Sequence, residues 1–149
     1  MTPVVIDASV WVAAADCADT LSGSSRAFLR AVMRLAQPIV LPAITRLEVA
    51  CALSRRLRNG ERGVALADDL LQSRLITERD LDPLLERAIT LGTASCLRAG
   101  DAFYAAAAAE RSALIISWDP ELIRRANAMT PEAWLAERAR SVNDLEAPR

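Results

Sequence analysis

The sequence predicts a single α/β domain in which a mainly parallel sheet is covered by helices on both faces. Short runs of β-branched and other aliphatic residues, typical of buried parallel strands, occur at 3–7, 39–41, 75–77 and 113–117. Longer segments with helical spacing separate these runs, so strands and helices alternate along the chain. A length of 149 residues is that of one domain, and no internal repeat or linker interrupts it.

The helices are predicted from apolar spacing, alanine content and end signals. Phe28, Leu29 and Val32 form one apolar side of the first. The second stops at Asn59-Gly60, and later ones have proline in the first turn. We expect residues 1–140 to form the domain and 141–149 to be a frayed tail. The predicted helices are 22–36, 43–59, 60–74, 83–97, 100–112, 120–128 and 131–140.

Composition excludes several classes of protein. The formal net charge is −1, so no overall positive field indicates a nucleic-acid binder. All 18 basic residues are arginines, and local clusters of arginine can still bind phosphate. The absence of histidine excludes hydrolases and nucleases that use it as a general base. Since no segment predicts a signal peptide or a membrane span, we expect a cytoplasmic protein.

The three cysteines, at positions 17, 51 and 96, indicate neither a disulfide framework nor a zinc site, because they are odd in number and widely spaced. Cys51 and Cys96 lie in apolar stretches, and we expect both to be small core residues. Reduced thiols agree with a cytoplasmic location.

Four acidic residues stand at positions that favour a shared site. Asp7 and Asp119 each closely follow a predicted strand, and ligands of open parallel sheets bind at those strand ends. Glu48 shares a helix face with small and apolar residues, where a carboxylate is unfavourable unless it is paired or binds a metal. Asp101 lies at the start of an alanine-rich helix. Several carboxylates without histidine predict a metal site with oxygen ligands.

Three of the four acids also have an explanation that involves no function. Asp101 and Asp119 could stabilise or cap a helix N-terminus, and Glu48 could lie half exposed at the edge of an apolar face. Asp7 is harder to explain in this way, because the strand before it is wholly apolar.

The chain resembles a PIN domain, and more narrowly the toxin ribonuclease of a VapBC-type toxin–antitoxin pair, over residues 3 to about 138. Four motifs carry the resemblance, in this order: Val5-Ile6-Asp7-Ala8-Ser9, Thr45-Arg46-Leu47-Glu48-Val49, Gly100-Asp101-Ala102 and Ile116-Ser117-Trp118-Asp119. The resemblance implies a three-layer α/β/α fold whose central, mainly parallel sheet has about four to five strands.

The resemblance also implies a metal-dependent endoribonuclease that hydrolyses RNA with Mg²⁺ or Mn²⁺. Its catalytic and metal-binding residues would be Asp7, Glu48, Asp101 and Asp119, with Asp7 and Asp101 as direct ligands. Small hydroxyl residues near the acids would support them, although Ser117 stands where threonine is frequent. These supporting residues are Ser9, Thr45 and Ser117.

The implied partners are the RNA substrate, a VapB-type antitoxin and a second copy of the chain in a homodimer. Arginines that cluster around one long helix and its end are candidates for phosphate contact, or simply a solvated helix surface. They are Arg46, Arg55, Arg56, Arg58 and Arg62.

Two other classes of α/β protein with acids at strand ends require residues that this chain lacks. A response-regulator receiver needs a lysine, which the chain lacks, and a phosphatase with an Asp-x-Asp motif needs an acid where Ser9 stands. A catalytically inactive PIN-like module that binds RNA or protein remains open. So does a PIN nuclease that processes RNA, or cleaves DNA, rather than acting as a toxin.

Overall fold

The computed structural model describes residues 1–146, with side chains as far as residue 141. Within this part, one sheet contains strands β1 Val4–Ile6, β2 Ile39–Pro42, β3 Ile76–Arg79 and β4 Leu114–Ile116. The helices are α1 Ala8–Ala15, α2 Ser22–Arg34, α3 Ile44–Leu57, α4 Gly60–Leu70, α5 Leu81–Ser95, α6 Ala99–Arg111, α7 Pro120–Arg125 and α8 Pro131–Glu146. None of the described helices is long and apolar enough to cross a membrane.

All four strands run parallel, in the spatial order β3-β2-β1-β4. In the central strand β1, Val4 pairs with Ile39 of β2 on one side and with Leu114 of β4 on the other. Strands β2 and β3 lie on one side of β1, and β4, the last strand in the chain, lies on the other side. This order creates a topological switch point between β1 and β4, where ligands of open parallel sheets bind.

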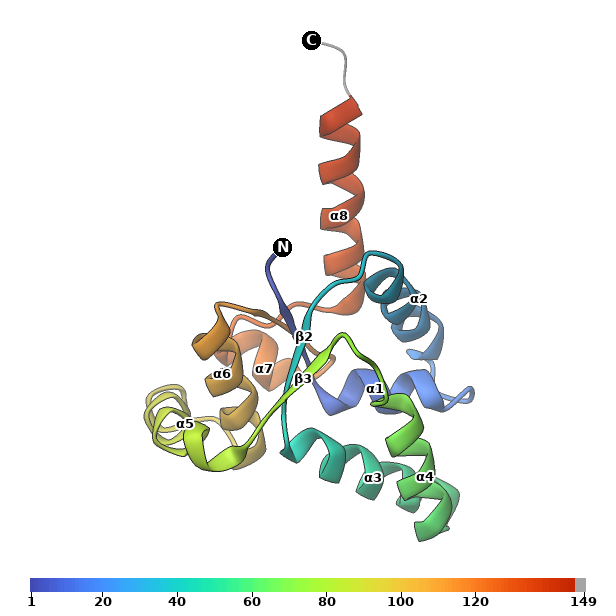
Figure 1. Cartoon of the computed structure of the whole chain (residues 1–149), viewed down its shortest axis with the longest axis vertical. Coiled ribbons are helices and arrows are strands. Elements are labelled where there is room, and N and C mark those ends of the chain that lie inside the picture. The colour runs from blue at the N-terminus through green and yellow to red at the C-terminus, as the bar shows by residue number, and fades with distance from the viewer. Residues whose placement is uncertain (147–149) are drawn as a thin grey trace.

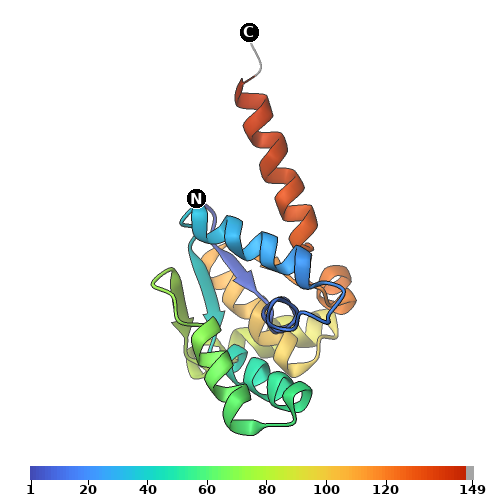
Figure 2. The ribbon, with the colours of Figure 1, turned by 90° about the vertical axis from the view of Figure 1, so that its right-hand side faces the viewer.

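Alternate residues of the strands build two separate cores. Val4 and Ile6 share a core with residues of α1 to α4 and with Phe28 and Trp134, the latter from α8. Val5 shares the opposite core with α5, α6 and α7. Figure 1 shows the sheet between these two groups of helices, and Figure 2 shows α8 extending away from the rest of the domain. The predicted three-layer α/β/α fold is confirmed.

The alanine-rich helix α6 packs closely on the sheet. Ala105, Ala106, Ala107 and Ala108 are buried, and α6 contacts β1, β2 and β4. Alanine favours helix, and its short side chain lets the two backbones approach. The first turn of α6, which contains Asp101, is thereby held at the carboxyl edge of the sheet.

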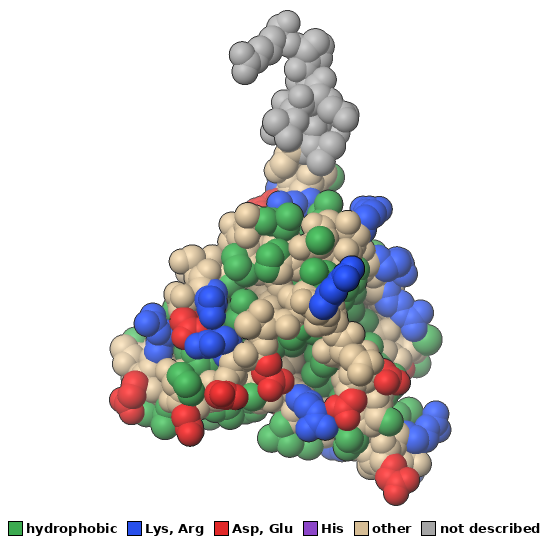
Figure 3. Space-filling model, in the orientation of Figure 1, with side chains coloured by type: hydrophobic (Ala, Val, Ile, Leu, Met, Phe, Trp, Pro, Cys, Tyr) green, Lys and Arg blue, Asp and Glu red, His purple; other side chains and the backbone are tan. Residues whose placement is uncertain are grey.

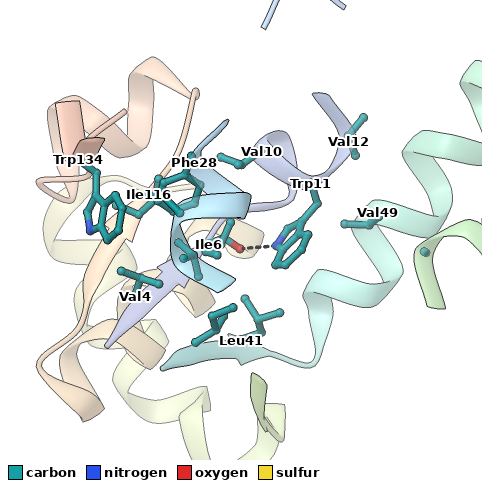
Figure 4. Packing of buried hydrophobic residues seen from close by; sticks show 14 of the residues in the cluster. Val4, Ile6, Val10, Trp11, Val12, Phe28, Leu41, Val49, Ile116 and Trp134 are labelled. Carbon is teal, nitrogen blue, oxygen red and sulfur yellow. Dashed lines mark hydrogen bonds between the residues drawn. The ribbon is translucent and has the colours of Figure 1, made fainter. Parts of the chain in front are cut away.

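The sequence pattern does not predict α1. Val10 to Ala14 are all buried, so the one-sided apolar spacing that marks an amphipathic helix is missing. The helix is fixed to the preceding strand by Trp11, whose indole N–H donates to the carbonyl of Ile6 at 3.3 Å (Figure 4). Because α1 follows β1 directly, it fixes the position of Asp7 between them.

Three predicted helices end three or more residues away from their predicted ends, and one of them, predicted over 120–128, ends at Arg125. The helix predicted over 60–74 ends at Leu70, before the turn that leads to β3. Residues 141–146, expected to belong to a frayed tail, continue α8 as far as Glu146. The rest of the expected tail, 147–149, lies outside the described residues.

The prediction that Cys51 and Cys96 are core residues is wrong, because both are exposed. Helix α3 directs Val49 and Leu53 into the core, which leaves Cys51 on another face. Cys96 ends α5 in a left-handed backbone conformation, at φ 52°, on the surface.

Candidate active site

Acidic side chains from four separate segments line one pocket of about 540 Å³ at the carboxyl edge of the sheet. Asp7 follows β1 and caps α1, and Asp119 follows β4 and caps α7. Glu48 lies in α3, and Asp101 lies in the first turn of α6. The structure therefore brings together the four acids that the sequence motifs single out.

Asp7 is only 6% exposed and is held by hydroxyl groups. Its Oδ2 atom accepts from the backbone N–H of Ser9 at 3.2 Å, from the Ser9 hydroxyl, and from the Ser117 hydroxyl at 2.8 Å. Both serines also accept from backbone N–H groups of the segment between β4 and α7: Ser9 from Trp118 at 3.1 Å and Ser117 from Asp119 at 2.9 Å. Among the described side chains, Oδ1 of Asp7 has no hydrogen-bond partner, so it remains available to a ligand.

Arg98 bridges two of the acids. Its Nε atom donates to Oδ2 of Asp101 at 3.0 Å, and its Nη2 atom donates to Oδ2 of Asp119. The other oxygen of Asp119 accepts from Glu121 N–H at 2.8 Å, so both of its oxygens are engaged. Burial raises the pKa of Asp101, and the Arg98 guanidinium opposes that rise.

Glu48 is positioned by Tyr104 and by the missing side chain of Gly100. The Tyr104 hydroxyl donates to Oε2 of Glu48 at 2.6 Å and accepts from Ala8 N–H at 3.3 Å. A Cβ atom at residue 100 would lie 2.6 Å from Oε1 of Glu48. Burial, reinforced by Asp7 and Glu48, raises the pKa of Tyr104 well above its usual range, so the phenol keeps its proton. Burial also raises the pKa of Glu48, and the Tyr104 hydrogen bond opposes that rise.

Two of the five candidate RNA-binding arginines line the pocket, Arg55 and Arg56. Arg56 is ion-paired with Asp16 at 2.6 Å and with Asp19 at 3.0 Å. Arg55 makes no ion pair with any side chain that the structure describes. Of the two arginines that line the pocket, Arg55 is therefore the one whose charge is more available to a phosphate.

The other three candidate arginines lie away from the pocket lining. Arg46 pairs with Asp68 of α4 at 2.6 Å, Arg58 ends α3 in a left-handed conformation, and Arg62 lies in the first turn of α4. On the face shown in Figure 3, acidic and basic side chains are intermixed. The positive charge near the acids is thus local.

Three residues that position the acids were missed from the sequence: Arg98 and Gly100, which line the pocket, and Tyr104, which is buried behind it. Arg98 precedes Asp101 by three residues, a spacing at which ion pairs form in helices, so that signal was present. Tyr104 lies about one turn after Asp101, and a buried tyrosine hydroxyl usually finds a partner. No signal in the sequence relates Gly100 to Glu48, because they lie in different helices.

The donor set fits a hard divalent cation, because Mg²⁺ and Mn²⁺ prefer carboxylate oxygens and several acids line one pocket. Among the described residues, no three acids converge closely enough to enclose an ion as they stand. Arg98 lies between two of them. Thr45, expected to support the site, is buried and does not line the pocket. Among the described residues its hydroxyl makes no hydrogen bond of good geometry, but it lies close enough to the Tyr104 hydroxyl to oppose the rise in the pKa of Tyr104.

Comparison with known protein families identifies the family of this chain. The sequence pattern of the PIN domain matches residues 4–144, almost the whole chain. The chain belongs to the PIN-domain family. No curated protein sequence matches it closely enough to count as a relative.

Solved structures of similar fold cover most of this PIN domain. VapC20 of Mycobacterium tuberculosis, a toxin that cleaves the sarcin-ricin loop, has a TM-score of 0.68 and 17% identity over 81% of this chain and 93% of its own. PAE2754 from Pyrobaculum aerophilum has a TM-score of 0.69 and 19% identity over 93% and 96% of the two chains. FitAcB from Neisseria gonorrhoeae has a TM-score of 0.59 and 20% identity over 85% and 95%. At these identities the likeness shows the fold.

Proposed function

We propose that this PIN domain is a metal-dependent endoribonuclease and the toxin component of a VapBC-type toxin–antitoxin pair. The observation that carries the proposal is the pocket at the switch point of the sheet, lined by Asp7, Glu48, Asp101 and Asp119. Membership of the PIN family supports nuclease chemistry. The shared fold of VapC20, a toxin that cleaves the sarcin-ricin loop, supports the toxin role by similarity.

Asp7 and Asp101 would hold Mg²⁺ or Mn²⁺ directly, and Glu48 and Asp119 would bind through water or orient the nucleophile. When bound, such an ion lowers the pKa of a coordinated water and neutralises charge on a phosphate. The serine hydroxyls hold one oxygen of Asp7 and leave the other without a hydrogen-bond partner among the described residues, so this carboxylate would be oriented before substrate arrives.

Hydrolysis would proceed by attack of water on the phosphodiester phosphorus. The bond from the water oxygen to phosphorus forms as the bond to the leaving ribose oxygen breaks, with no covalent enzyme intermediate. Glu48, about half buried and held by Tyr104, would orient the attacking water. Arg55, at the pocket wall, would contact a neighbouring phosphate.

The partners in this proposal follow from the family. They are an RNA substrate, a cognate VapB-type antitoxin and a second copy of the chain, and the RNA substrate implies action in the cytoplasm. The same observations leave one competing function. Because Arg98 neutralises two acids and no three described acids converge, an inactive PIN-like module that binds RNA or protein is the alternative.

Cleavage of a mixed RNA pool by the purified, partner-free protein tests the proposal. We would compare wild type with Asp101→Asn and with Asp82→Asn, whose acid also lies in the first turn of a helix but outside the pocket. Wild type and Asp82→Asn should cleave with Mg²⁺ or Mn²⁺ and stop with a chelator, and Asp101→Asn should not cleave. Equal cleavage by wild type and Asp101→Asn would refute the site. No cleavage by any of them would favour the inactive module.

A further inference from the structure

Arg98 occupies one carboxylate oxygen on each of two acids that we assign to the divalent cation, Asp101 and Asp119. It engages Oδ2 of both Asp101 and Asp119, and backbone N–H of Glu121 engages the remaining oxygen of Asp119. Asp119 therefore has no oxygen free of hydrogen bonds. A cation that used this carboxylate directly would have to break the contact with Arg98, because the alternative is to uncap α7.

We propose that Arg98 is a displaceable internal counter-ion, which neutralises Asp101 and Asp119 while no divalent cation is bound and competes with that cation for their oxygens. The inference rests on the proposed function, since it assumes that these acids bind a metal. Arg98 would act on the two acids of this pocket and not directly on RNA.

The need for a counter-ion follows from the crowding of the acids. Asp7 and Asp119 lie close enough to Asp101 for their negative charges to repel it, and Asp7 and Asp101 act on Glu48 in the same way, because like charges in a partly desolvated pocket repel. Arg98 supplies a positive charge at this place. The charge of a bound divalent cation would do the same, so the two cations are alternatives.

The side chain of Arg98 is also free to move away from the acids. Its backbone is fixed as the residue before α6, in an extended conformation at φ −68° and ψ 157°. Its side chain is 68% exposed, so the guanidinium can move into solvent with little loss of burial. Exposed ion pairs are weak, which makes displacement feasible. By contrast, the bidentate pair between Arg79 and Glu110 is 27% exposed on each side and joins β3 to α6.

Arg124 offers a matched control. Like Arg98, it forms an ion pair with an acid three residues away in sequence, here Glu121, and its side chain is 64% exposed. It does not line the acidic pocket. Replacing either arginine by glutamine removes one exposed, ion-paired positive charge, so only a specific role of Arg98 distinguishes the two variants.

The test is a Mn²⁺ titration of the full chain by calorimetry, comparing wild type, Arg98→Gln, Arg124→Gln and Asp101→Asn. Arg98→Gln should bind Mn²⁺ about fivefold more tightly than wild type, the effect of removing a competing ion pair worth ~1 kcal/mol. Arg124→Gln should match wild type, and Asp101→Asn should bind more weakly. Binding alone is measured, so the result does not depend on RNA cleavage.

Thermal unfolding gives a second measurement. In chelator, Arg98→Gln should melt about 2–4 °C below wild type, because its acids have lost their counter-ion. Saturating Mn²⁺ should remove this difference, whereas any difference shown by Arg124→Gln should persist. A deficit of Arg98→Gln that Mn²⁺ leaves unchanged would assign Arg98 a purely structural role and overturn the inference.

The titration separates failure of this inference from failure of the proposed function. If wild type binds Mn²⁺ more tightly than Asp101→Asn but Arg98→Gln binds no better than wild type, the metal site stands and the counter-ion role is refuted. If neither wild type nor Arg98→Gln binds more tightly than Asp101→Asn, the metal site does not exist and both proposals fail.

Discussion

Replacing Gly100 by alanine should damage the pocket without damaging the fold. The added methyl carbon would lie 2.6 Å from Oε1 of Glu48, so the carboxylate must retreat by about 1 Å to reach ordinary contact. Gly23 is the control: it is the second residue of α2, as Gly100 is of α6, and a Cβ atom there meets nothing within 4 Å.

The magnitudes follow from two opposing effects. Glycine to alanine in a helix stabilises by about 0.5–1 kcal/mol where the new side chain fits, so Gly23→Ala should gain that amount. Gly100→Ala should gain the same stabilisation of its helix, but the displacement of Glu48 would lengthen the 2.6 Å hydrogen bond that Glu48 accepts from Tyr104. Losing a hydrogen bond to a charged group costs about 1–2 kcal/mol, so Gly100→Ala should be less stable than Gly23→Ala by about that much.

Urea unfolding measures this difference, and Mn²⁺ titration and RNA cleavage measure its consequence. Gly100→Ala should remain folded but bind Mn²⁺ and cleave RNA less well than wild type, whereas Gly23→Ala should match wild type in both. The reasoning would be refuted if Gly100→Ala were as stable as Gly23→Ala and cleaved RNA at the wild-type rate. Glu48 would then have room to move without functional loss.

Three further predictions test separate parts of the structure. Tyr104→Phe should lower the free energy of unfolding by about 1–2 kcal/mol in urea melts, because it removes the donor to Glu48; an unchanged value would mean that this hydrogen bond adds nothing. Arg55→Ala should reduce the slope of log affinity for RNA against log salt by about 1, whereas Arg46→Ala, which lies outside the pocket, should not; equal slopes would remove Arg55 from the RNA site. The arginine at the end of β3 that forms an ion pair with Glu110 lowers the pKa of this carboxyl group. The carboxylate therefore stabilises the fold above its unfolded-state pKa, and this contribution is lost as the pH falls through its folded-state pKa. Glu110→Gln should therefore be less stable than wild type at about pH 7 but not at about pH 3, and a deficit independent of pH would contradict the assignment.

The sequence by itself determined the layers of this protein and the place of its acids. A parallel strand buried on both faces must be apolar along its length, and therefore Val4 to Ile6 and Leu114 to Ile116 are recognisable without a structure. The carboxyl ends of such strands meet at one edge, so acids that closely follow them were expected to meet as well. The same local rules failed for α1, whose residues are too uniformly apolar to show a helical face.

Only the tertiary structure decided how the acids are held and which charges accompany them. The contact of Gly100 with Glu48 joins α6 to α3, and the Tyr104 hydroxyl links Glu48 to the start of α1. The arginines of α3 likewise differ in their surroundings: Arg55 lines the pocket, whereas Arg46 forms an ion pair with Asp68 of α4. The physical reason is that periodicity fixes which face of an element is apolar, whereas contacts between polar side chains depend on how whole elements pack against one another.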